Sequence, residues 1–429
     1  MNKYRFLRAV LLVLIFIPTD TFAQRWTSQA SHPFSLKNFT ISSVNNKLYS
    51  IGGFTSTWIS HTFEYDPSLD SWTQKTRMPN GYFYVKSAVA NNKIYVVGYN
   101  GVELAVFEYD PSLDSWITKS GKTGWRYTFS VASYNNKIYV IGGRGSSGIT
   151  DLVEEYDPVS DTWQTKTPMP TARQSAAAVE YNGKIYVAGG NVVSQLLSTL
   201  EVYDPVLDTW TSKPSMLVPR KDLELQAVEG NIYSMGGSDN SPLTTVEEYN
   251  INSETWVVTD SMPTPRETFA SGVVNNIIYA VGGQSTASLT NVNEAFKASQ
   301  PRTPEGIISY SGDLNVQITW NSSTDSDLLK HVIYRSLNDG FSPLPADSIG
   351  FTLAPDTTFS DLTVSNGITY YYRISAVDST GNISEYSSQV SAFPQDITPP
   401  NAPQNLTAAG GPEIVLLKWD QNVEEDLHK

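Results

Sequence analysis

The chain of 429 residues contains no cysteine, and this absence excludes a group of chemistries. Without a thiol there is no disulfide, no thiolate metal ligand, no cysteine nucleophile and no cysteine that could carry a lipid. The four histidines lie far apart and show none of the spacings typical of a metal site; they are His32, His61, His331 and His428. The sequence therefore predicts a protein that is held together by packing alone and uses no metal or other cofactor.

Positive charge is also scarce. Lys and Arg number 29 against 43 Asp and Glu, which gives a net charge of −14. Nucleic acid needs clustered Lys and Arg to neutralise its phosphates. We therefore predict that the chain does not bind nucleic acid.

Long apolar runs are missing, apart from a short one near the start of the chain. MNKYRFLR supplies three positive charges, AVLLVLIFI is the apolar run, and TFA places small residues before Gln24. This pattern predicts a signal peptide over residues 1–23, cleaved after Ala23. Its removal changes the net charge from −14 to −16, because three positive charges and Asp20 are lost. No later segment is long enough to span a bilayer, so we expect a secreted or periplasmic protein without a membrane span.

The sequence does contain a repeat. YNNKIYVIGG has five close copies, and the first Gly of each unit falls at Gly52, Gly98, Gly142, Gly189, Gly236 and Gly282. Spacings of 44 to 47 residues predict an array of similar units. In the fourth unit, SAAAVEY, KIYVAGG, TLEVYDP and TWTSK predict four strands in succession. Asn182-Gly183 favours a tight hairpin between the first two of them.

Two further motifs accompany the repeat. EYDPSLDSW occurs at residues 64–72 and 108–116, and MPTAR at residues 169–173. Together with the Gly-Gly pairs, these motifs resemble the Kelch family of β-propellers over residues 24–299. The resemblance implies an all-β fold, a six-bladed propeller with four strands in each blade. The second repeat departs from the pattern, since Tyr99 replaces the second Gly, and this puts its local backbone in doubt.

A Trp follows the first Gly in five of the six units; these are Trp72, Trp116, Trp163, Trp210 and Trp256. The last unit lacks its Trp and ends at NEAFKA. Trp26 lies 46 residues before Trp72, on the same period, but precedes the first complete unit. We predict that residues 25–28 form the outer strand of the blade built from residues 266–297. The N-terminal strand would then close the ring and leave no exposed sheet edge.

The period stops at Thr303. VQITW, HVIYRS and ITYYYRISAVDSTGNIS predict strands, and over residues 302–395 they resemble a fibronectin type III β-sandwich. The resemblance makes Trp320 the core Trp and Tyr370 the corner tyrosine. Residues 396–429 are predicted to be a stiff linker and a truncated second fibronectin type III domain, because Trp419 follows Trp320 by 99 residues.

Four arginines lie 16 residues before the first Gly of their units; they are Arg126, Arg173, Arg220 and Arg266. Tyr82 occupies this position in the second unit. In Kelch propellers the position lies at the channel mouth, and in some members such arginines hold acidic peptides. A ring of guanidinium groups would suit a carboxylate or sulfate ligand. The favoured alternative is structural, with each Arg paired to a repeat Glu such as Glu154, Glu201 or Glu247.

Two tryptophans are not explained by the repeat. Trp58 lies in a variable loop, and Trp125 directly precedes Arg126. Both are candidate ligand-binding residues that would stack on a sugar or pack on a peptide; the alternative is a Trp folded over its own loop. No catalytic residue is predicted, because the paired acids Glu154 and Glu155 occupy consecutive strand positions and point to opposite faces.

These patterns predict a secreted, non-catalytic, adhesion-type protein. The loop face of the propeller would recognise a protein or an extracellular glycan, and fibronectin type III modules would act as spacers. One alternative is a carbohydrate-active enzyme. Galactose-oxidase chemistry is excluded because it needs a Tyr–Cys crosslink, whereas an Arg ring would suit the acidic sugar of a sialic-acid mutarotase. The other alternative is a structural spacer without a site.

Overall fold

In the computed structural model, the described residues are 25–99, 103–298, 300–323, 325, 328–378, 382–397 and 401–420. They divide into two compact units, Gln24–Gln300 and Pro301–Lys429. The described residues are almost entirely β-structure, with one short 3₁₀ helix at Pro345–Asp347. No described segment forms a helix long and apolar enough to cross a membrane. The predicted signal peptide, residues 1–23, lies outside the described residues.

Six antiparallel four-stranded sheets make up most of the described part of Gln24–Gln300. Their strands are β2 (Thr40–Val44), β3 (Lys47–Ile51), β4 (Thr62–Asp66) and β5 (Ser71–Lys75); β6 (Phe83–Ala90), β7 (Lys93–Tyr99), β8 (Glu103–Asp110) and β9 (Ser115–Thr123); β11 (Ser130–Tyr134), β12 (Lys137–Ile141), β15 (Val153–Asp157) and β16 (Thr162–Lys166); β17 (Ala177–Tyr181), β18 (Lys184–Ala188), β21 (Leu200–Asp204) and β22 (Thr209–Lys213); β23 (Glu224–Val228), β24 (Asn231–Met235), β25 (Val246–Asn250) and β26 (Thr255–Thr259); and β27 (Ala270–Val274), β28 (Ile277–Val281), β29 (Asn293–Lys297) and β1 (Trp26–Gln29).

The local sequence explains the hairpin between the first two strands of each sheet. In the fourth unit, Asn182 and Gly183 both have positive φ, 49° and 78°, as a two-residue hairpin turn requires. Strands β17, β18, β21 and β22 occupy the four predicted segments. Short connecting pieces add the small strands β10 (Arg126–Tyr127), β13 (Arg144–Gly145), β14 (Gly148–Ile149), β19 (Asn191–Val192) and β20 (Gln195–Leu196).

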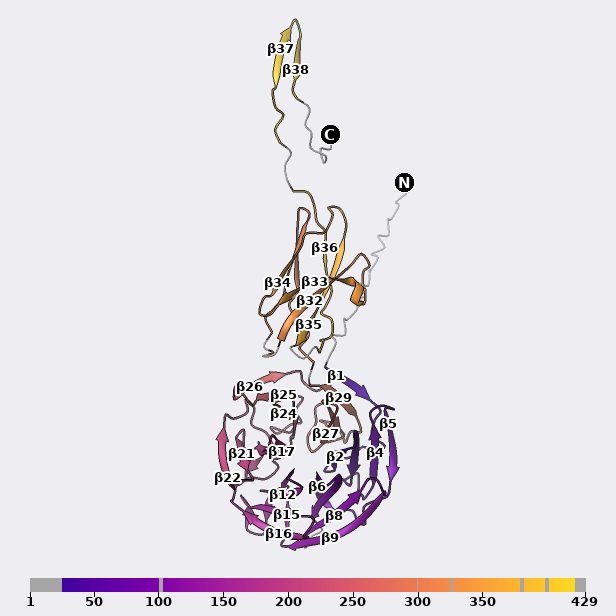
Figure 1. Ribbon diagram of the computed structural model, residues 1–429, viewed down its shortest axis with the longest axis vertical. Helices are drawn as coiled ribbons and strands as arrows, with labels where there is room; N and C mark the ends of the chain where they lie inside the picture. The colour runs from indigo at the N-terminus through magenta and orange to yellow at the C-terminus, as the bar shows by residue number, and fades with distance from the viewer. Residues whose placement is uncertain are drawn as a thin grey trace, which may run out of the picture. The chain divides into compact units, whose positions relative to one another are not determined.

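The first strands of the six sheets contact one another in a circle. The order of contact is β2, β6, β11, β17, β23, β27 and again β2. The fourth strands lie at the rim of the ring, where β5, β9, β16, β22, β26 and β1 follow one another (Figure 1). Apolar side chains of adjacent sheets form the buried clusters between them.

The last sheet is completed by the N-terminal strand, as predicted. Strand β1 pairs antiparallel with β29, and Trp26 lies opposite Phe296. The strand covers residues 26–29 rather than 25–28. The Trp26 indole Nε1 donates to the Asp260 carbonyl at 2.9 Å, just as Trp72 Nε1 donates to the Ala30 carbonyl at 2.9 Å. The pairing of the chain ends is therefore confirmed.

The second repeat unit differs from the others in its local backbone, where Tyr99 replaces a Gly. In the third and fourth units the second Gly has positive φ, and an added Cβ would lie about 2.6–2.7 Å from a carbonyl oxygen. In the second unit β7 instead continues through Tyr99, which pairs with Leu104. The partner strand β6 has a register irregularity between Phe83 and Lys86. The departure thus changes the backbone here and leaves the four-stranded sheet intact.

The described part of the second compact unit, Pro301–Lys429, contains two packed sheets. One has the order β30 (Ile308–Gly312), β31 (Asn315–Thr319) and β34 (Thr358–Asp361), and the other β33 (Ser348–Leu353), β32 (Leu328–Ser336), β35 (Tyr370–Asp378) and β36 (Val390–Ala392). Their shared core includes Trp320 and Tyr372. The Tyr370 hydroxyl accepts a hydrogen bond from the Ser365 N–H at 3.0 Å. Residues 401–420 contain a separate hairpin, β37 (Thr407–Gly411) and β38 (Ile414–Lys418), with exposed side chains.

Candidate functional site

The four predicted arginines are buried in ion pairs, each with a glutamate of its own repeat unit. Their exposed fractions are between 0% and 4%. The N–O distances are 2.7 Å for Arg126–Glu154, 2.6 Å for Arg173–Glu201 and 2.5 Å for Arg266–Glu294, and Arg220 pairs with Glu247. Burial lowers the pKa of each Arg, and the paired carboxylate opposes this shift.

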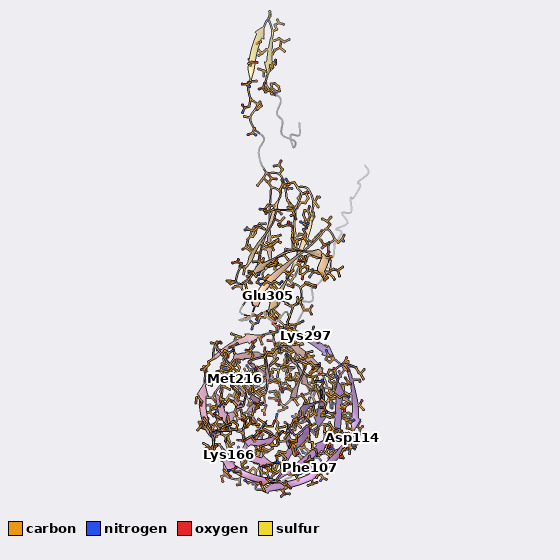
Figure 2. All side chains as sticks on the ribbon, in the orientation of Figure 1. Phe107, Asp114, Lys166, Met216, Lys297 and Glu305 are labelled. Atoms are coloured by element: carbon orange, nitrogen blue, oxygen red, sulfur yellow. The ribbon has the colours of Figure 1, made fainter. Side chains whose placement is uncertain are left out.

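The same guanidinium groups also bind backbone. Arg173 Nη1 donates to the carbonyls of Gly189 and Thr199 at 3.2 and 3.1 Å. Each Arg therefore ties the start of its unit to the second-to-third loop of the same unit. This is the geometry of the structural alternative, and it leaves the groups enclosed rather than turned towards a ligand. Tyr82, at the matching position, is also buried and packs on Phe107, labelled in Figure 2, at a ring distance of 5.1 Å.

Two residues beyond each of these positions, every unit has a residue with left-handed backbone. We call this set the mouth ring; it consists of Asn38, Tyr84, Thr128, Ser175, Asp222 and Thr268, with φ between 47° and 54°. Backbone hydrogen bonds join neighbouring members, for example from Asp222 N to Ser175 O at 2.9 Å and from Thr268 N to Asp222 O at 3.1 Å. Burial raises the pKa of Asp222, while a hydrogen bond from Ser175 opposes the shift. The mouth ring encircles a cavity of about 50 Å³.

An ion pair crosses the axis beneath this cavity. Lys86 on β6 and Glu224 on β23 come from units on opposite sides of the ring, and Lys86 Nζ lies 2.6 Å from Glu224 Oε1. At the matching positions of the other units the residues are Thr40, Ser130, Ala177 and Ala270, whose small side chains leave the axis open. We call Lys86 and Glu224 the axial pair. Below it lies a channel of about 260 Å³ lined by all six first strands.

Trp58 and Trp125 belong to a larger group, which we call the aromatic sector. It consists of Phe54, Trp58, Tyr84, Tyr99, Trp125 and Tyr127, all partly exposed. The rings of Trp125 and Tyr127 are 5.7 Å apart and nearly parallel at 11°. Tyr84 lies 5.6 Å from Tyr127 and 6.1 Å from Trp58. The structure therefore brings the two predicted tryptophans into one continuous surface through Tyr84 and Tyr127.

The sequence reasoning missed three tyrosines of this surface and the axial pair. The sequence contains a signal for these tyrosines, because all three depart from the repeat. Tyr84 stands where other units have a polar residue, Tyr99 where they have a glycine, and Tyr127 mostly where they have a charged or polar residue. Lys86 and Glu224 share one repeat position, three units apart. No group of three or more His, Asp or Glu side chains suited to a metal occurs in the residues that the structure describes.

Comparisons with known proteins agree with the repeat architecture. Residues 118–283 match the family model "KLHDC2/KLHL20/DRC7 Kelch-repeats domain", and residues 35–79 match "Kelch motif". A solved structure titled "Structure of YjhT" superposes with a TM-score of 0.54 and 17% identity, covering 62% of this chain and 96% of that one. The chain thus contains Kelch repeats and has the fold of a β-propeller over these residues.

The curated relatives match short segments. Kelch repeat and BTB domain-containing protein 12 of Homo sapiens is 32% identical over 83 residues, 17% of this chain and 13% of that protein. An F-box/kelch-repeat protein of Arabidopsis thaliana is 37% identical over 79 residues, 18% and 16% of the two chains. Amylopullulanase of Thermoanaerobacterium saccharolyticum is 35% identical over 96 residues, 22% and 7%. The chain spans at most 16% of the length of these relatives.

Proposed function

We propose that the chain is a secreted, non-catalytic binding protein. In this proposal the six sheets are the blades of a six-bladed Kelch propeller, whose loop face binds a protein or an extracellular glycan. Residues 302–395 form a fibronectin type III domain that acts as a spacer. The three-stranded and four-stranded sheets of that unit, together with the Tyr370 hydrogen bond, support the fibronectin type III assignment.

The observation that carries the binding role is the aromatic sector. Large aromatic side chains that are only partly buried are enriched where proteins bind partners. The repeat shows what the scaffold requires at each position, and the sector departs from it at neighbouring positions of adjacent units. Kelch-repeat domains generally bind proteins, which agrees with the same role.

The arrangement of charges supports a role without catalysis. The glutamates that recur in the units are held in ion pairs: Glu154 contacts Arg126, and Glu155 lies 2.7 Å from Lys137 and accepts from the Tyr139 hydroxyl. Lys137 and Tyr139 keep the pKa of Glu155 below its usual range although burial opposes this. A carboxylate held ionised by permanent partners does not suit a general acid.

A binding experiment tests the proposal. The chain from Gln24 onward is applied to a peptide library and to a glycan array, beside a Trp125→Ala/Tyr127→Ala variant. Leu113→Ala is the matched control, because Leu113 is 72% exposed and lies in the β8–β9 turn. In an antiparallel sheet that turn lies on the face opposite to the second-to-third loop. We expect binding that the double variant loses and the control retains; unchanged binding by the double variant would contradict the proposal.

A further inference from the structure

We propose that the aromatic sector and the mouth ring form one binding site for an uncharged, pyranose-containing oligosaccharide. The inference rests on the binding role proposed above and names the chemical class of its ligand. Four observations carry it: the arrangement of the rings, their departure from the repeat, the cavity beside them with its polar groups, and the paired charges around it.

The rings form a tiled surface. Tyr127 lies at its centre, with Trp125 at 5.7 Å and 11°, Tyr84 at 5.6 Å and 28°, and Tyr99 at 6.3 Å and 26°. These centroid distances and small angles are those of offset, roughly parallel rings. Because the rings are offset and these residues are partly exposed, the rings leave open patches for a ligand. Successive sugar rings of an oligosaccharide present flat C–H faces that match such patches.

The fold does not require these aromatic residues. At the repeat position of Tyr127 the second unit also has an aromatic residue, Phe83, whereas the others have Lys37, Gln174, Lys221 and Glu267; at that of Trp125 the other units have Ser35, Gly81, Ala172, Pro219 and Pro265. Tyr84 has a φ of 47°, a left-handed conformation that is strained for a bulky residue. Every unit has this backbone at the matching position, so the scaffold sets the φ, and Tyr84 is the one aromatic residue placed there.

Tyr84 joins the aromatic surface to a cavity of mixed lining, in which apolar side chains such as Phe129 and Phe269 lie beside the polar ones of the mouth ring. The cavity of about 50 Å³ is lined by Tyr84, Thr128, Ser175, Asp222 and Thr268, among others. Thr268 Oγ1 is buried and has no hydrogen-bond partner among the described residues. The space is large enough for a water-sized group, so it suits a hydroxyl or hydroxymethyl group. A sugar ring stacked beside Tyr84 would therefore find hydrogen-bonding groups for its rim.

The charges favour an uncharged ligand. The four arginines that would attract a carboxylate or sulfate are each paired with a glutamate. In the axial pair, Glu224 neutralises Lys86 at the cavity floor. The Asp222 carboxyl lines the cavity and lies 3.7 Å from Lys221 Nζ, so this cation is also paired. These features argue against the acidic sugar and the acidic peptide that an open Arg ring would have suited.

The test measures binding of maltoheptaose, cellohexaose and mannohexaose to the chain from Gln24 onward by calorimetry, with a sialic-acid oligomer as the anionic probe. We expect at least one neutral oligosaccharide to bind and the anionic probe not to bind. Trp125→Ala and Tyr127→Ala should each weaken binding about tenfold or more, the loss expected at a hot spot. Tyr127→Phe and Leu113→Ala should keep it.

The outcomes separate this inference from the proposed function. Binding of a peptide or protein that depends on Trp125 and Tyr127, without binding of any neutral sugar, would overturn the glycan assignment and keep the binding role. Binding of the anionic probe alone would also overturn it. Glycan binding that survives Trp125→Ala and Tyr127→Ala, in variants whose melting temperatures match the parent, would refute the site. If no peptide, protein or sugar binds at this face, both proposals are refuted.

Discussion

Replacing Trp26 by Ala should destabilise the protein strongly, although Trp26 lies close to the predicted mature N-terminus. Residues at chain ends normally tolerate such changes because they fray. Trp26 is instead 4% exposed and stacks on Phe296 at 4.8 Å. It also belongs to a core cluster that includes Tyr233 and Met262 of the fifth and sixth units.

The magnitude follows from these contacts. Truncating a buried Trp to Ala typically costs about 3–5 kcal/mol. The hydrogen bond from Trp26 Nε1 to Asp260 O adds about 0.5–1.5 kcal/mol. Strand β1 has only four residues, so losing its anchoring side chain should also weaken its pairing with β29. We expect a total loss of about 4 kcal/mol or more in the free energy of unfolding.

Circular dichroism during urea unfolding measures this loss without relying on Trp fluorescence. Trp163→Ala is the matched control, because Trp163 has the same repeat position and donates to Ser120 O at 3.1 Å but is only partly buried. Trp26→Ala should cost at least as much as Trp163→Ala, and Ser28→Ala, at an exposed site in β1, should cost little. A Trp26→Ala variant as stable as the parent would refute the closure of the ring by β1.

Other predictions follow from the buried polar groups. His32 is caged by aromatic rings, and burial lowers its pKa to about 4; since the unfolded His binds protons below about pH 6.5, stability should fall between pH 6.5 and 4 by up to about 3 kcal/mol. Urea titrations at several pH values should show that His32→Phe flattens this part of the curve, and parallel curves for variant and parent would contradict the assignment. Arg220→Ala should lower the free energy of unfolding by about 3–5 kcal/mol because it leaves Glu247 buried without its cation. Arg220→Leu/Glu247→Leu should lower it much less, and equal losses in the two variants would show that the unpaired Glu247 is not the cause. Lys86→Glu should destabilise by about 1–2 kcal/mol, a value reduced for solvent exposure, and the added Glu224→Lys exchange should restore stability in a thermal melt unless the two groups do not interact. Metal analysis of protein purified without added metal should find no stoichiometric zinc or copper, and either metal at one equivalent would sink that prediction.

Much of the repeat architecture could be predicted because each unit states the same local rules again. The four strands of the fourth unit and the pairing of β1 with β29 came from period-2 alternation, turn residues and one displaced Trp. Strand ends differed by one or two residues, since hairpin geometry rather than residue type decides where pairing stops.

The site was harder to predict because it depends on contacts between units. The recurring arginines drew attention as charges, but whether a buried charge faces a ligand or a partner depends on the side chain opposite, and in Arg266 that partner is Glu294. Tyr84 and Tyr127 come from different sheets, and only the ring geometry places them 5.6 Å apart. Departures from the repeat would have indicated both residues.

The pairing of β1 with β29 also sets the order in which the chain can finish folding. Arg25 and Lys297, which are joined by a hydrogen bond, lie 272 residues apart, so β1 has no partner until almost the whole propeller has been synthesised. Contacts of such long sequence separation form slowly. In a chain that already contains β29 but has not made this contact, the edge of β29 is open to β1 of any neighbouring molecule, as in domain swapping. Refolding should therefore yield single rings at low protein concentration and exchanged dimers as the concentration rises.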